Sequence, residues 1–282
     1  MTRLRFLIII FTPIIIISSC SRRIQCAQVP GTVKVDNSYF IRATELTVRE
    51  YLEFIVSNDN NPALYPDSTL LGLLPYKFLL DDISKQSNFK YFKLGKQAPG
   101  PIGFFLKMKK QGNKEENEKL KSVMFMPITA ISYDQAQQYC KWLENKFNSI
   151  TQKHPVCKVN IALPTIETYK NLIKNKDSIC VSNCTSNCNF NFNYNQTKCD
   201  NNSVIGIELN TNKLVRCDRF PADNYGIFNL QGNAAEITSE KNISMGGSYI
   251  HTAKDSYSNA QIGYTKPEIW LGFRFVVTKY SK

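Results

Sequence analysis

Hydrophobic positions recur at helical spacing in several separate parts of the chain. The apolar pair Phe40-Ile41 predicts a strand, and residues 46–55 then carry apolar side chains along one helix face, with Thr47 placed to cap that helix. Ser132, followed three residues later by Gln135, predicts a capping box at the start of a second helix. The expected buried face of this second helix is formed by Ala136, Tyr139, Cys140 and Leu143, with Trp142 on an adjacent face.

The rest of the chain shows weaker periodicity. Thr165 is placed to cap a third helix, with Tyr169 and Leu172 on its buried side. Residues 57–120 are rich in Asn, Pro and Lys, and we expect long loops and an insertion there. From Val215 to Val277, glycines, aromatics and short apolar pairs predict short strands joined by tight turns. The pattern therefore favours one α+β domain without internal repeats, in which loops take up much of the length.

The N-terminus has the pattern of an export signal. Arg3 and Arg5 precede an apolar run, residues 6–17, and about twelve apolar residues are too few to span a bilayer, which needs roughly 20. The run fits the apolar region of a signal peptide. It ends in Ile-Ser-Ser-Cys, which resembles the lipobox of bacterial lipoproteins and predicts lipidation of Cys20. The alternative is an ordinary signal peptide in which Cys20 stands by chance.

These features give a predicted domain organisation. Residues 1–19 are expected to be the lipoprotein signal peptide, and residues 20–37, which are polar, to be a lipid-anchored tether. Residues 38–282 are expected to form the folded domain, with insertions at about 57–120 and 175–214.

Composition and charge narrow the class of protein. The 282 residues are 43% hydrophobic and 21% charged, which excludes a disordered chain, a collagen and a coiled coil. The net charge is +12, yet the basic residues are mostly single Lys, and the one dense stretch, residues 107–121, also carries three Glu and lacks aromatic residues. Without aromatics for base stacking we expect a solvated loop there and no nucleic-acid partner.

The cysteines favour an oxidising compartment. Nine Cys stand beside two His, a balance more typical of exported proteins than of cytosolic zinc proteins. Eight Cys remain besides Cys20, and we expect disulfides among them, although eight allow about 105 pairings. Cys180, Cys184 and Cys188 lie four apart, but turn-favouring spacers indicate disulfides rather than a metal cluster.

Five segments, taken in order, resemble the formylglycine-generating-enzyme, or sulfatase-modifying factor, domain family. Their similarity to the family motifs extends over about residues 39–277. The segments are Phe40 to Thr47, Pro127 to Leu143, Leu163-Pro164-Thr165 with Tyr169 in place of a Trp, Asn224 to Glu236, and Met245 to Tyr249 with Leu271 to Arg274. The resemblance implies a variant of the C-type lectin fold that is rich in loops.

The family's catalytic positions are degenerate in this sequence. Family members that oxidise a sulfatase cysteine carry two Cys after the Gly-Gly-Ser motif, which bind copper as thiolates, and thiolates suit Cu(I). His251 and Ser256 stand at those positions, and no Cys follows Cys217. The resemblance therefore implies that copper and the oxidase chemistry are absent, and His251 is interpreted as a loop histidine. We predict no catalytic residue.

The resemblance also implies two structural features. A calcium site of the family matches the side chains of Asn229 and Glu236 and the carbonyls of Gly232 and Ala234, all hard oxygen donors. The alternative is an ion-free turn with Glu236 in a salt bridge. The family partner of Cys140 normally follows the Gly-Phe-Arg motif, where this chain has Phe275, so any disulfide of Cys140 must be a different one.

Three functions fit these observations. The favoured hypothesis is a non-catalytic lipoprotein of the bacterial envelope that binds or assembles with protein partners, similar to gliding-motility and type IX secretion lipoproteins. Its lipid anchor would hold it to a membrane, expected to be the outer membrane with the protein facing the periplasm, because no acidic cluster follows Cys20. The alternatives are a divergent formylglycine-generating-type oxidase and a calcium-dependent module that binds glycans or peptides.

Overall fold

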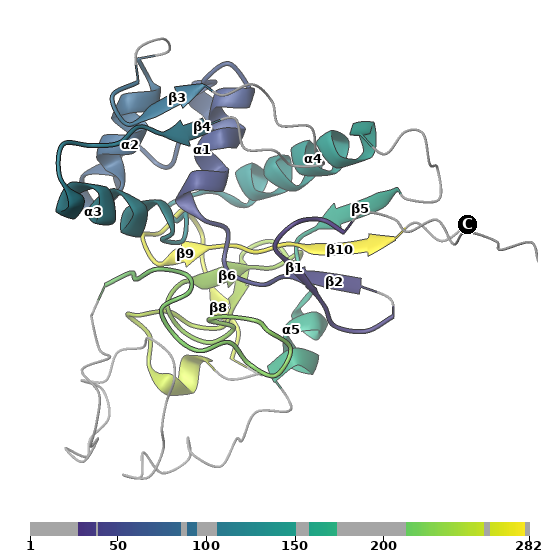
Figure 1. The fold of residues 1–282 in the computed structure, drawn as a ribbon. Coiled ribbons are helices and arrows are strands. Elements are labelled where there is room, and N and C mark those ends of the chain that lie inside the picture. The colour runs from purple at the N-terminus through teal and green to yellow at the C-terminus, as the bar shows by residue number, and fades with distance from the viewer. Residues whose placement is uncertain are drawn as a thin grey trace, which may run out of the picture.

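The computed structural model describes residues 28–37, 39–85, 89–94, 106–150, 158–173, 213–256 and 260–279. These residues form the expected α+β fold, with short strands and long connections (Figure 1). The larger sheet is antiparallel in the order β1-β2-β10-β5. Its strands are β1 (Thr32–Lys34), β2 (Tyr39–Arg42), β5 (Val159–Ala162) and β10 (Val276–Lys279). The last strand thus lies between the second and fifth, so the two ends of the domain meet in one sheet.

A second sheet is built almost entirely from the C-terminal part of the chain. Its order is β8-β7-β6-β9, with β6 and β9 parallel and the other pairs antiparallel. The strands are β6 (Ala235–Ile237), β7 (Ile243–Met245), β8 (Ile262–Gly263) and β9 (Leu271–Gly272). Glu236 sits in its central strand, opposite Met245 on one side and Gly272 on the other. This register places the Glu236 carboxylate in the middle of the domain.

The predicted helix starts are confirmed. Helix α1 (Val48–Ser57) begins at a capping box, in which the Thr47 hydroxyl accepts from the Glu50 amide and the Glu50 carboxylate from the Thr47 amide. Ser132 and Gln135 make the same reciprocal bonds, at 3.2 and 2.8 Å, before α4 (Tyr133–Ile150). Helix α5 (Ile166–Ile173) begins after Thr165, whose hydroxyl accepts from the Thr168 amide at 3.0 Å.

The main core lies between helices α1 and α4 and the larger sheet. Figure 1 shows α4 running along the face of β5 and β10, with α1 beside it. Tyr139 of α4 is the centre of an aromatic cluster, with ring centroids 5.4 Å from Phe54, 5.4 Å from Trp142 and 5.5 Å from Phe273. The buried face predicted for α4 is confirmed, because Ala136, Tyr139, Cys140 and Leu143 are all 3% exposed or less.

The expectation of long loops over residues 57–120 is wrong for much of that range. It contains two short 3₁₀ turns, η1 (Pro62–Leu64) and η2 (Leu71–Leu73), helices α2 (Lys77–Ile83) and α3 (Lys114–Met124), and the paired strands β3 (Phe92–Leu94) and β4 (Leu106–Met108). Sparse apolar residues anchor these elements to the main core, among them Tyr76, Leu79, Leu80, Ile83, Phe92 and Leu120. The charged stretch 107–121 is thus partly helical, with Asn113 capping α3.

The tether is shorter than expected. Val29 is buried at 2% exposure, and β1 pairs with β2 through Val33 and Ile41. Gly31 permits this, because it takes a φ of +72° and its carbonyl accepts from the Ala43 amide at 2.9 Å. The folded domain therefore begins before residue 38. The signal peptide and Cys20 lie outside the described residues, as does the insertion at 175–214 except its last two residues.

Two predicted disulfide candidates are reduced. Cys140 and Cys217 are both buried free thiols in the part of the chain that the structure describes, so the expectation of disulfides is wrong for these two. The other candidates, Cys26, Cys157, Cys180, Cys184, Cys188 and Cys199, lie outside the described residues. Across the described residues, no helix combines the length and apolar character needed to span a bilayer.

Candidate functional site

A buried ion pair occupies the centre of the family-like motifs. The turn from Asn229 to Asn233 leads into β6 through left-handed residues, with φ of +45° at Asn229, +78° at Gly232 and +59° at Asn233. Glu236 then meets Arg274, which follows β9, in two hydrogen bonds of 2.5 Å, and the side chains are 1% and 0% exposed. Two segments distant in the sequence are thereby joined by a bidentate bond without water.

The remaining donors and acceptors of this pair are also used. Tyr169 of α5 donates its hydroxyl to Glu236, at the position where the resemblance has Trp. The guanidinium of Arg274 additionally donates to the carbonyl oxygens of Arg42 at 3.2 Å and Phe228 at 2.9 Å. A buried charge is tolerated where it is paired and its hydrogen bonds are satisfied. The network therefore links α5, β2, the 229–236 turn and the last strand.

A second buried carboxylate, Glu45, lies next to this pair. Its oxygens accept from the side-chain amides of Asn229 at 3.1 Å and Asn233 at 2.8 Å. Burial raises the pKa of Glu45 to about 7, and the negative charge of Glu236 adds to this against the attraction of Arg274. Glu45 thus titrates near neutrality inside the domain.

The titration of Glu45 predicts a stability that depends on pH. A carboxyl whose pKa is higher in the folded state contributes stability below its unfolded pKa, here about 4.5, and loses it as the pH rises through about 7. We expect the free energy of unfolding, measured with urea, to fall over this window. Glu45→Gln stays uncharged and is expected to flatten the dependence; an equal slope in the variant would contradict the assignment.

The proposed calcium donors are only partly free. The amide oxygen of Asn229 is buried without a hydrogen-bond partner within the described part of the chain, as a cation ligand would be. Glu236, however, has both oxygens bonded to Arg274 and Tyr169. The described residues also contain no group of three or more His, Cys, Asp or Glu that could hold a metal ion. In this arrangement the set of Asn229, Gly232, Ala234 and Glu236 lacks a free carboxylate for calcium, and the calcium site stays a prediction from the resemblance.

A melting experiment tests the calcium prediction without any substitution. A cation that binds the folded state alone stabilises it by roughly 2.7 kcal/mol at one hundred times its dissociation constant. Because Arg274 and Tyr169 hold Glu236, we expect the melting temperature to be the same in millimolar calcium and in excess chelator. Magnesium serves as the control cation. A rise in melting temperature specific to calcium would show that the ion binds.

His251 and Ser256 stand at the positions of the family copper ligands, and they offer an imidazole and a hydroxyl in place of two thiolates. The Nδ1 atom of His251 lies 2.6 Å from the Ser248 hydroxyl, and its ring stands edge-on to Trp270 at 4.6 Å between centroids. Ser256, at the end of the 3₁₀ turn η6 (Ala253–Ser256), is fully buried, and its carbonyl accepts from the Gln231 side chain at 3.0 Å. An imidazole and a hydroxyl cannot replace two thiolates, so this pair does not fit Cu(I).

The sequence pattern indicated some members of this network but not their contacts. The resemblance implies Glu236 as a calcium ligand, with a salt bridge as the alternative, and the structure pairs its carboxylate with Arg274. Glu45 and Arg274 lie in the motifs that carry the resemblance, which was the available signal for them. Nothing in the spacing of Cys217 indicates that its carbonyl accepts from the Asn229 side chain, because that contact depends on the folded loop.

A family model matches nearly the whole chain. The sequence model of the sulfatase-modifying factor enzyme 1-like domain matches residues 21–279. A search of curated protein sequences finds no match.

Solved structures with a similar fold share little sequence with this chain. PvdO from Pseudomonas aeruginosa is 11% identical, with 86% of this chain and 80% of that chain covered and a TM-score of 0.46. Variable protein 1 of Treponema denticola is 13% identical, with 91% and 94% covered and a TM-score of 0.44. CarF is 12% identical, with 89% and 96% covered and a TM-score of 0.46.

Proposed function

The chain belongs to the sulfatase-modifying factor enzyme 1-like family, and from this premise we propose that it is a non-catalytic, lipid-anchored protein of the bacterial cell envelope. It uses the family domain to bind or assemble with other envelope proteins, in the manner of gliding-motility and type IX secretion lipoproteins. Cys20 carries the anchor, and the domain faces the periplasm from the outer membrane. The lipobox-like segment before Cys20 and the absence of an acidic cluster after it support this placement.

The observation that carries the non-catalytic assignment is the donor chemistry at His251 and Ser256. Cys oxidation with copper requires soft thiolates to hold Cu(I), and the two side chains offer a nitrogen and a hydroxyl. His251 already interacts with Ser248 and Trp270, and Ser256 is buried. These contacts support a structural role for His251 and Ser256. A domain that keeps the fold without the ligands is suited to recognition.

Assembly is tested by affinity purification of the tagged full-length protein from detergent-solubilised envelopes. A structural component of an envelope complex is expected to bring down the same partners in fixed stoichiometry. Cys20→Ser is the matched control for anchoring, since it removes the acylated thiol and should shift the protein from the membrane to the soluble fraction. If the wild-type protein brings down nothing, the assembly function is contradicted.

Catalysis is tested by metal analysis together with an oxidation assay on a cysteine-containing peptide. Purified protein is expected to contain no stoichiometric copper and to leave the peptide unchanged. The double variant His251→Cys, Ser256→Cys is the positive control, because two thiolates at these positions should restore Cu(I) binding. Stoichiometric copper and peptide turnover in the wild-type protein would contradict the proposal and favour the divergent oxidase.

A further inference from the structure

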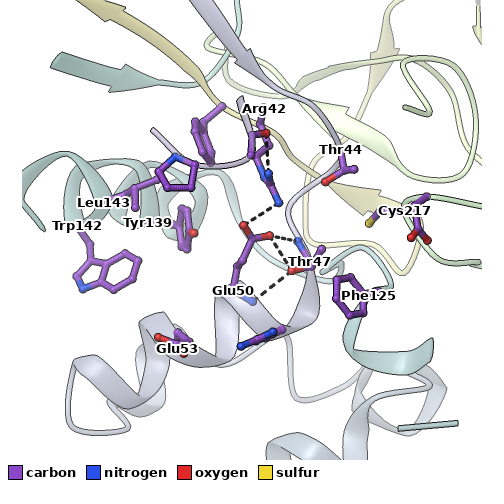
Figure 2. A pocket seen from close by; sticks show the side chains of 15 residues that line it. Arg42, Thr44, Thr47, Glu50, Glu53, Phe125, Tyr139, Trp142, Leu143 and Cys217 are labelled. Carbon is purple, nitrogen blue, oxygen red and sulfur yellow. Dashed lines mark hydrogen bonds and ion pairs between the residues drawn. The ribbon is translucent and has the colours of Figure 1, made fainter. Parts of the chain in front are cut away.

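A cavity of about 280 Å³ lies between the start of α1, helix α4 and the turn around Cys217, away from His251 and Ser256 (Figure 2). The apolar lining, called here the aromatic wall, consists of Phe125, Tyr139, Trp142, Leu143 and Phe275. The polar lining, called here the polar wall, comes from the segment that runs from the end of β2 into α1 and consists of Arg42, Thr44, Thr47, Arg49, Glu50 and Glu53. Phe125 is 38% exposed, so the cavity reaches the surface beside it.

The polar wall is largely saturated by its own hydrogen bonds. Figure 2 shows Arg42, Thr47 and Glu50 joined to one another across it. Glu50 accepts from Arg42 at 2.8 Å and from the amide and hydroxyl of Thr47 at 3.0 and 2.7 Å, so both oxygens of its carboxylate have partners. The hydroxyl of Thr44 donates to the Glu45 carbonyl at 2.9 Å. The Glu50 carboxylate and the hydroxyls of Thr44 and Thr47 are therefore satisfied within the protein and do not require a ligand.

Arg42 contributes a donor to this wall that its own contacts do not use. Arg42 uses one terminal nitrogen on Glu50 and the other on the Gly31 carbonyl at 2.7 Å, but its Nε–H is buried without an acceptor among the described residues. Leaving a buried donor unpaired costs the full desolvation of that group. An acceptor oxygen brought in by a molecule in the cavity would remove this cost.

The charges around the cavity favour an uncharged molecule. Glu50 neutralises Arg42, Arg49 and Glu53 carry opposite signs, and Asp218 is paired with Arg216 at 2.8 Å. An anion would thus meet Glu50 and Asp218 without an excess of positive charge. A neutral carbonyl oxygen accepts from Arg42 without this repulsion, while the aromatic wall supplies stacking and burial of apolar surface.

The volume sets the size of the molecule. An apolar cavity of about 150 Å³ holds one benzene, so 280 Å³ accommodates roughly eleven non-hydrogen atoms. We propose that this cavity binds a small, uncharged, aromatic or apolar molecule whose carbonyl oxygen accepts a hydrogen bond from the Nε–H of Arg42. The site is separate from the family's catalytic positions and from the proposed assembly function.

Three probes of matched shape test the proposal on the full chain by ligand-observed NMR and calorimetry. Benzylacetone carries a ketone, butylbenzene lacks it, and hydrocinnamate replaces it with a carboxylate. We expect benzylacetone to bind about tenfold more tightly than butylbenzene, in keeping with one hydrogen bond to a charged group, and hydrocinnamate to bind more weakly than the ketone. No binding of benzylacetone, equal binding of ketone and hydrocarbon, or a preference for the carboxylate would each overturn the proposal.

Two variants locate the binding. Arg42→Lys keeps a positive charge beside Glu50 but has no Nε–H, so it should lose the preference for the ketone while butylbenzene still binds. Thr44→Phe fills the cavity from the polar wall and should abolish binding of both probes. Ketone preference that survives in Arg42→Lys would overturn the assignment of the donor, and the three-probe comparison in the wild-type chain stands even if a variant does not fold.

Discussion

Replacing Arg274 with methionine is expected to lower the free energy of unfolding by about 3–5 kcal/mol, because Glu236 would be left as a buried charge without its partner. Arg274 is 0% exposed and contributes two hydrogen bonds to Glu236 and others to the backbone carbonyls of Arg42 in β2 and of Phe228, just before the 229–236 turn. Chemical denaturation followed by circular dichroism measures the change. A loss under about 1 kcal/mol would show that the pair is not the centre of the fold.

An exposed ion pair and a double substitution provide the controls. Lys77 and Asp81 on α2 form an i,i+4 pair with side chains 47% and 53% exposed, so Lys77→Met is expected to cost less than about 1 kcal/mol. Combining Arg274→Met with Glu236→Leu removes the unpaired charge, and the double variant should recover part of the stability lost in Arg274→Met. Simple additivity of the two substitutions would contradict a direct coupling.

Replacing Phe273 with alanine is expected to cost about 3–5 kcal/mol, through lost burial and the cavity left behind. Phe273 lies between β9 and β10, is 0% exposed and packs edge-on against Tyr139 of α4 at 5.5 Å. Its carbonyl also accepts from the Leu46 amide at 2.8 Å, which the substitution preserves. The loss, measured by urea unfolding, should therefore report the side-chain burial and packing and not this backbone hydrogen bond.

The matched control for Phe273 is a large apolar residue that packs less. Leu73 is 66% exposed in η2, so Leu73→Ala is expected to change the free energy of unfolding by about 0.5 kcal/mol or less. Similar losses in the two variants would contradict the placement of Phe273 in the main core. A loss in Phe273→Ala with an unchanged denaturant slope would indicate that the compactness of the two states is preserved.

Local signals in the sequence determined the helix starts and several strands. Thr47, Ser132 and Thr165 bond to amides three residues ahead, so the cap and its partner lie within one turn and need no distant contact. A local signal also predicted β2, because the apolar pair Phe40-Ile41 lies within that strand. The family motifs added the fold class, because their order and spacing along the chain reflect one arrangement of strands and turns.

The tertiary structure decided the features that depend on distant residues. Helices α2 and α3 become stable by packing a few apolar side chains, such as Leu79 and Leu120, onto a core supplied by other segments, so their own pattern was too weak to predict them. Val29 and β1 join the sheet because β2 offers a partner edge.

The identity of Glu236's partner was decided in the same way. A carboxylate after a Gly-Asn turn suits calcium or a cationic side chain equally well in sequence, and only folding brings Arg274 to it from 38 residues away. The sequence by itself therefore determined the local caps, the family and the missing thiolates at His251 and Ser256. The structure determined which buried groups meet, because pairing of buried charge depends on contacts that no local pattern encodes.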